Sequence, residues 1–188
     1  NQRVHGPDYP HFITQDWSAP WRQQRIEQLL EQTPKHDARS LQAIHADQLS
    51  LATQLLLPVL QRTRSEHPLA AAAMAQLQNF KGLMAAEGAA PLIYTAWVDE
   101  LTRGVIGEKV GRERFEKIYG KRLFRSGIEN IMTSGDRQWC GDGGCGGASM
   151  RALDRALDKL QAAYGQDPAR WSWGQAHPAL SVHRPFSN

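Results

Sequence analysis

The sequence has no apolar run approaching the roughly 18–20 residues that a membrane span needs. It lacks the GxSxG, Walker-loop and HExxH motifs, and no stretch of any length alternates apolar and polar residues as a half-buried strand does. It has little excess charge of one sign, only +3, and its 22 Lys and Arg are not clustered but interleaved with 19 Asp and Glu. These absences exclude the catalytic classes that those motifs define and argue against a nucleic-acid surface.

Cysteine is scarce, since only Cys140 and Cys145 occur, both within the glycine-rich stretch WCGDGGCGG. A metal site would need further thiols or histidines at suitable spacing, and none lies near in the sequence. Two thiols so close could close a small disulfide or stay free. We favour the disulfide, then free thiols, then a metal. A disulfide would indicate an oxidising compartment such as a periplasm.

Apolar residues recur at three- and four-residue intervals over most of the chain of 188 residues, which predicts helices. The most apolar pattern, residues 91–101, should form the buried centre of the bundle. A regular amphipathic helix should begin at Ser149 as its N-cap and end at Gly165. Pro58 should kink or restart its helix. The first helix should have Ser18 as its N-cap and Pro20 in its first turn, and should end at Pro34. Further helices are predicted over residues 40–49, 51–62, 69–78, 111–119 and 126–132, with a last turn after Asp167. The sequence predicts a mostly α fold.

Both ends of the chain lack the helical pattern and are expected to be extended. Residues 1–17 include the turn sequence Gly6-Pro7-Asp8, and residues 177–188 include two proline breaks. The predicted division is therefore an extended segment over residues 1–17, a helical domain over residues 18–176, and an extended return segment over residues 177–188.

Internal residues offer little evidence of chemistry of their own. Asp154 and Asp158 lie one helical turn apart but alternate with basic residues, as ordinary ion pairs on a polar face do. The histidines have no metal-ligand spacing, so no metal site is predicted. The glycine-rich stretch lacks the Lys-Ser/Thr ending of a phosphate-binding loop. The tryptophans Trp139, Trp171 and Trp173 are best interpreted as packing anchors.

Five blocks, in order, carry a resemblance to a known family. The opening reads NQRV…GPDYP…DW.AP.R..RI..LL, and it is followed by Ile44-His-Ala-Asp47 with Ser50. The later blocks are Ala90-Pro91 leading to Ala96-Trp97, then Trp139-Cys140 with Cys145, and finally Tyr164-Gly-Gln-Asp-Pro…Trp171-Ser-Trp173-Gly174…His177. Together they resemble the penicillin acylase family of N-terminal-nucleophile hydrolases. The resemblance implies that the extended ends would join an αββα hydrolase core.

The resemblance gives roles to two residues near the start of the chain. The first Asn of the family's Asn-Asn pair falls on Asn1, which would donate its amide N–H to the oxyanion of a tetrahedral intermediate. One such donor is typically worth about 3–4 kcal/mol. The supporting arginine falls on Arg22, with Arg25 as the less favoured register. The second Asn of the pair is Gln2 here, and the family's Trp-Asp-Gly appears as Phe80-Lys81-Gly82.

The family's nucleophile is a serine at the N-terminus of its β chain, and it lies upstream of Asn1 in family order. We therefore expect this chain to be a fragment, the helical middle of a β chain, and to be inactive alone. The parent would cleave a linear amide, releasing an acyl group from an amine such as a β-lactam nucleus or homoserine lactone.

The expected partners are the α chain, the remaining β chain and a small-molecule amide, with no nucleic acid and no membrane. No cofactor is expected beyond a possible structural calcium in the whole enzyme, for which Asp16 is a weak candidate ligand. The expected location is periplasmic or secreted, in a bacterium. The alternatives are a stand-alone all-α interaction module and a family member without catalysis.

Overall fold

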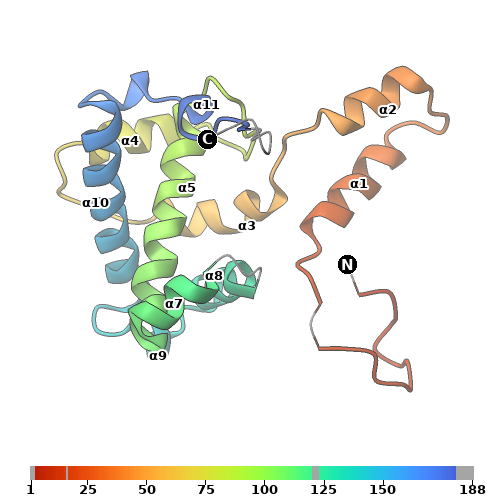
Figure 1. Cartoon of the computed structure of the whole chain (residues 1–188), viewed down its shortest axis with the longest axis horizontal. Helices are drawn as coiled ribbons and strands as arrows, with labels where there is room; N and C mark the ends of the chain where they lie inside the picture. The colour runs from red at the N-terminus through yellow and green to blue at the C-terminus, as the bar shows by residue number, and fades with distance from the viewer. Residues whose placement is uncertain (1–2, 16, 120–122, 181–188) are drawn as a thin grey trace, which may run out of the picture.

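A computed structural model describes residues 3–15, 17–119 and 123–180. Within these ranges the chain is mostly α-helical and has no β-strand, only an isolated antiparallel bridge between Leu49 and Leu83. The mostly α prediction is confirmed. In Figure 1 the N-terminal part of the chain, with α1 and α2, stands to one side of a larger helical body.

The helices follow one another along the whole described chain. Their bounds are α1 Trp21–Glu31, α2 Ala38–His45, α3 Leu51–Leu60, α4 Ala70–Leu77, α5 Ala89–Thr102, the π-helix η1 Arg103–Gly107, α6 Glu108–Val110, α7 Arg112–Ile118, α8 Leu123–Ser134, α9 Arg137–Cys140, α10 Gly144–Tyr164, the 3-10 helix η2 Pro168–Arg170 and α11 Trp173–Ala176.

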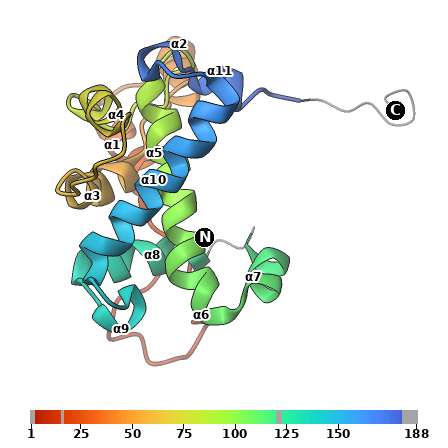
Figure 2. The ribbon, with the colours of Figure 1, turned by 90° about the vertical axis from the view of Figure 1, so that its left-hand side faces the viewer.

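The core of the helical body is the pair α5 and α10, which run side by side in both views (Figures 1 and 2). Trp97 on α5 has no exposed surface, and its indole Nε1 donates to the backbone oxygen of Ser149 on α10 at 2.9 Å. Leu153 and Leu157 of α10 are buried in the same cluster. The prediction that residues 91–101 lie at the buried centre is therefore confirmed.

The central helix is longer than its apolar pattern indicates, because α5 passes through the π-helix η1 into α6. Gly104 in η1 makes room for Arg155 of α10, since a Cβ at Gly104 would lie 2.6 Å from an Arg155 Nη atom. Arg155 Nε donates to the buried Glu100 carboxylate at 3.0 Å, and Lys159 also pairs with it. A buried carboxylate needs such partners, because an unpaired one is strongly destabilising.

The N-terminus of α10 differs from the sequence prediction. The helix begins at Gly144 within the glycine-rich stretch, so Ser149 is not its N-cap but lies inside the helix. Ser149 is buried and its Oγ accepts from Thr63 Oγ1 at 2.8 Å. A disulfide joins Cys140, the last residue of α9, to Cys145 in the first turn of α10. This bond ties the end of α9 to the start of α10 within the glycine-rich stretch.

The N-terminal helices also begin elsewhere than the sequence indicated. The N-cap of α1 is Pro20, and α2 begins at Ala38, with a capping box between Asp37 and Ser40. Helix α3 runs through Pro58 to Leu60 without a break. Pro58 has no N–H to donate to the Gln54 carbonyl, but the loss is limited to this one bond and the helix ends two residues later.

None of the helices in the described ranges combines the length and apolar character that crossing a membrane requires. Likewise, no group of three or more His, Cys, Asp or Glu side chains among the described residues could hold a metal ion.

Candidate functional site

Helix α1 carries both arginines that the sequence singled out, and the structure gives them different surroundings. Arg25 forms a two-point ion pair with Asp47, with Nη2–Oδ1 at 2.6 Å and Nε–Oδ2 at 2.9 Å. The hydrogen bond from Arg25 lowers the pKa of the Asp47 carboxyl, and the same bond raises the pKa of Arg25. Arg22, one helical turn earlier, is exposed. Arg25 is thus committed to an internal ion pair.

Arg22 and Arg25 border a pocket of about 430 Å³ between α1, α2 and the start of α3. Most of its surface is apolar, and an ion pair of opposite charges lies at its edge. The apolar side chains that line it are Ile26, Leu29, Ile44, Leu49 and Leu51. Ser50 and His45 also line it, but among the described residues no hydrogen bond joins them, and Ser50 Oγ accepts from Thr53 Oγ1 at 3.0 Å. The pocket therefore suits a binding surface better than a reaction.

A buried carboxylate joins α1 to the helical body. Glu129 on α8 has a side chain 3% exposed and accepts from Arg125 Nε at 2.8 Å. Its other oxygen accepts from the indole Nε1 of Trp21, at the start of α1, at 3.0 Å. Arg125 also donates to the hydroxyl of Tyr94, whose pKa is raised by burial. These contacts link α1, α8 and α5 in one polar network.

The predicted oxyanion donor cannot be placed. Asn1 lies outside the described residues, as do Gln2 and the weak calcium candidate Asp16. Of the predicted catalytic pair only Arg22 is described, so the structure does not test whether Arg22 supports Asn1.

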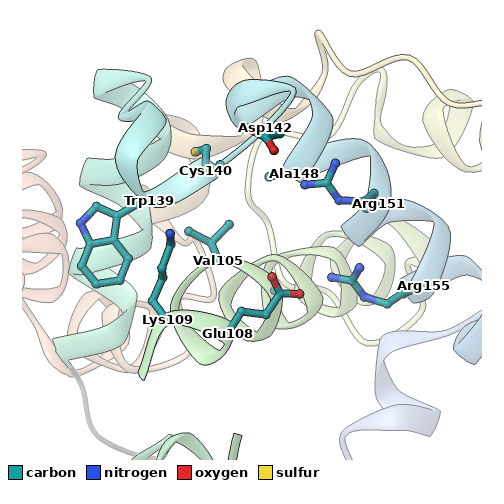
Figure 3. Close-up of a pocket in the computed structure, with 11 residues that line it drawn as sticks. Val105, Glu108, Lys109, Trp139, Cys140, Asp142, Ala148, Arg151 and Arg155 are labelled. Atoms are coloured by element: carbon teal, nitrogen blue, oxygen red, sulfur yellow. The ribbon is translucent and has the colours of Figure 1, made fainter. Parts of the chain in front are cut away.

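A second pocket of about 300 Å³ lies beside η1 and the disulfide (Figure 3). Figure 3 shows the side chains of Lys109, Glu108, Arg151 and Arg155 around it, with Trp139 and Cys140 on the α9 side. Three cations, Lys109, Arg151 and Arg155, and two carboxylates, Glu108 and Asp142, line this pocket. This mixture of charges points to no single ligand class.

A serine, a histidine and two aspartates also come together near the start of α4, but not as a catalytic triad. Ser65 Oγ donates to Asp154 at 2.5 Å, and His67 Nε2 lies 3.2 Å from Asp158. The other ring nitrogen, His67 Nδ1, accepts from the backbone N–H of Leu69. The imidazole therefore has no free nitrogen with which to accept a proton from the serine.

The model of the penicillin amidase family matches residues 1–187. The chain belongs to this family. It is 23% identical over 202 aligned positions to the acyl-homoserine lactone acylase QuiP of Pseudomonas fluorescens, and the match covers 94% of this chain and 25% of the relative. It is 24% identical to the QuiP acylase of Pseudomonas putida, covering 97% of this chain and 26% of that relative. The chain thus spans about a quarter of the length of these relatives.

Family membership confirms the resemblance that the five sequence blocks indicated. The sequence missed the contacts that hold α1. Glu129 belongs to none of the five blocks. The one available signal was the position of Asp47 inside the second block. Nothing local marked Glu129, because its α1 partner is 108 residues away.

Proposed function

We propose that this chain is the helical part of an acylase that hydrolyses a linear amide and that it supplies the oxyanion side of the active site. The single observation that carries the proposal is the family match over residues 1–187. The names of the Pseudomonas relatives favour N-acyl-homoserine lactones as the substrate class, ahead of β-lactam amides.

In the proposed reaction a serine outside this chain adds through its hydroxyl oxygen to the amide carbon, while its own α-amine takes the hydroxyl proton. Asn1 donates its side-chain N–H to the oxyanion that forms. The C–N bond then breaks, and the amine leaves with the proton. Water releases the acyl group from the serine ester in the second half of the reaction. No cofactor takes part, and a structural calcium would serve only the stability of the whole enzyme.

Exposed apolar side chains support the proposal that the chain packs against the rest of a longer polypeptide. Val4 is 76% exposed and Phe12 79% exposed on the segment that precedes α1. Further exposed apolar side chains on this segment, α1 and α2 are Tyr9, Ile13, Ile26, Leu30 and Leu41. Such a concentration is typical of a surface that is covered in the complete protein. The proposed partners are the α chain and the remaining β chain of the same precursor.

The Cys140–Cys145 disulfide supports a proposed periplasmic or secreted location, because disulfides persist mainly in oxidising compartments.

The test uses the whole enzyme with N-acyl-homoserine lactones, and mass spectrometry measures the released fatty acid. Asn1→Ala should lower kcat by about 10²–10³-fold, as the loss of one oxyanion donor does. The matched control is Asn130→Ala, which removes an exposed asparagine on α8 and should leave kcat unchanged. Unchanged turnover in Asn1→Ala would contradict the oxyanion role. A wild-type enzyme without amide hydrolysis would favour a non-catalytic family member.

The isolated 188-residue chain should release no fatty acid. Hydrolysis by this chain alone would contradict the proposal that the nucleophile lies elsewhere. If the natural gene product ended at the bounds of this chain, a stand-alone interaction module would be the better explanation.

A further inference from the structure

Helix α1, which carries Arg22, the arginine to which the resemblance gives a supporting role, is held by polar contacts at two points, one to α8 and one to the segment between α2 and α3. None of its residues is buried. Its packing is limited to half-buried side chains such as Trp21 and Leu29. Because α1 buries so little apolar surface, apolar packing alone fixes its position poorly. Directional polar contacts must therefore contribute more to holding it in place.

The first contact lies at the start of α1, where Trp21 Nε1 donates to Glu129 Oε2 at 3.0 Å. Glu129 is itself fixed, because Arg125 holds its second oxygen at 2.8 Å and its side chain is only 3% exposed. A hydrogen bond to a buried and charged acceptor is stronger than one between neutral groups.

The second contact lies one turn further along, where Arg25 grips Asp47 with two nitrogen atoms. Asp47 is 18% exposed and also accepts from the backbone N–H of Leu49 at 3.3 Å. Leu49 forms the bridge to Leu83, so this carboxylate is tied to the loop between α4 and α5. The two-point geometry fixes direction as well as distance.

Trp21 and Arg25 are four residues apart and therefore lie on the same face of α1. Two contacts on one face, one turn apart, fix both the position of the helix along its axis and its rotation about that axis. Arg22 follows Trp21 directly, about 100° around the helix. The contacts that set the rotation of α1 therefore also set the direction in which the Arg22 side chain leaves the helix.

We infer that Glu129 and Asp47 are positioning residues for the amide hydrolysis proposed above: through Trp21 and Arg25 they hold α1 in the rotation that directs Arg22 to the oxyanion side. The inference rests on the proposed function. Neither carboxylate contacts the reacting atoms in this role. A misplacement of about 1 Å far from the chemistry can cost about 10²-fold in rate, so contacts of this kind matter to turnover.

The test uses the whole enzyme and two variants that each remove one contact. Asp47→Asn removes the charge that Arg25 grips, and Trp21→Phe removes the N–H that Glu129 accepts while keeping an aromatic ring. In each variant kcat should fall about 10–100-fold while KM changes less than about threefold, because the lost support acts in the transition state. Asp47→Glu, which keeps a carboxylate, should recover most of the kcat.

Hydrogen exchange measured by mass spectrometry on the same proteins supplies the structural readout. Peptides from α1 should exchange faster in both variants, while α5 peptides should not change. Glu113→Gln is the control, since it breaks an exposed ion pair with Lys117 within α7 and should alter neither kcat nor α1 exchange.

Three results would overturn the inference or its basis. Unchanged α1 exchange in both variants would show that these contacts do not hold the helix. Faster α1 exchange with unchanged kcat would show that the rotation of α1 does not matter to the reaction. A wild-type enzyme that hydrolyses no amide would overturn the proposed function and the role of Arg22 with it. In that case the exchange rate of α1 in the two variants would still show whether the contacts hold the helix.

Discussion

The α5–α10 pair and the N-terminal region, residues 3–15 and 17–45, hold their helices by opposite means. In the pair, large apolar side chains such as Trp97, Ile93 and Leu157 are fully buried. In the N-terminal region neither α1 nor α2 buries a residue, and a few polar contacts fix α1. Apolar burial stabilises the pair, whereas polar contacts fix the orientation of α1 in the N-terminal region. The two regions should therefore fail under different conditions.

The largest effect is expected where the pair is broken at its centre. Trp97→Ala would remove a fully buried side chain and its hydrogen bond to Ser149, and should lower the free energy of unfolding by roughly 3–5 kcal/mol. Urea denaturation followed by circular dichroism would measure it. Ile26→Ala on α1, where the side chain is 37% exposed, is the comparison and should cost less than about 1 kcal/mol. Equal losses in the two variants would contradict the contrast between the regions.

The next effect concerns the junction between the regions. Gly82 has φ +95°, in the left-handed region, and a Cβ at this position would lie 2.7 Å from the backbone oxygen of Ser50. There is therefore no room for a side chain at this position. Gly82→Ala should cost about 3 kcal/mol, because backbone strain and overpacking each cost about 1–3 kcal/mol. Thermal unfolding would show the loss as a lower Tm.

The control for Gly82→Ala is Gly146→Ala in α10, where the new Cβ would meet nothing within 4 Å. That variant should be neutral or slightly stabilising, because Ala favours helix over Gly. A similar fall in Tm for both variants would point to a general intolerance of alanine rather than to the contact with Ser50.

A smaller effect is expected at the far end of the pair. Replacing both Cys140 and Cys145 by serine should cost about 2 kcal/mol, because the disulfide closes a loop of only a few residues. Hydrogen exchange should rise in α9 and the first turn of α10 while α1 remains unchanged. Faster exchange in α1 would contradict the independence of the two regions.

The smallest effect is a pH response of the N-terminal region. Arg25 lowers the pKa of Asp47, so the ion pair contributes stability at pH values above the pKa of the unfolded carboxyl, about 3.9. This contribution is lost as the pH falls through the lower pKa of the folded state. Amide signals of α1 should therefore shift below about pH 4 in nuclear magnetic resonance spectra, before those of α5 change. In Asp47→Asn the response of α1 should be absent.

Much of the fold followed from local sequence pattern, and the exceptions have physical reasons. The buried centre at α5 was predictable because its apolar residues dominate the helix on most sides. The start of α10 was not, because Gly144, Gly146 and Gly147 have low helix propensity and a tertiary disulfide anchors that turn. Ser149 looked like an N-cap because serine favours that position, yet its hydroxyl is used across the core by Thr63.

The candidate site was predictable to a smaller extent. The family resemblance drew attention to Arg22 and Arg25, but only the fold distinguishes the arginine paired with Asp47 from the exposed one. The contact between Trp21 and Glu129 joins segments 108 residues apart, and no local pattern encodes a pair at that separation.

The close approach of Gly104 to Arg155 links the residue at position 104 to the neutralisation of Glu100. A side chain at position 104 would occupy the space of the Arg155 guanidinium, and the guanidinium is what neutralises Glu100. The guanidinium is the far end of a flexible side chain that is 41% exposed, so it can swing away from a new side chain at position 104. Gly104→Ala would therefore act mainly by loosening the hold of Arg155 on the buried Glu100 carboxylate, and not by forcing α5 and α10 apart.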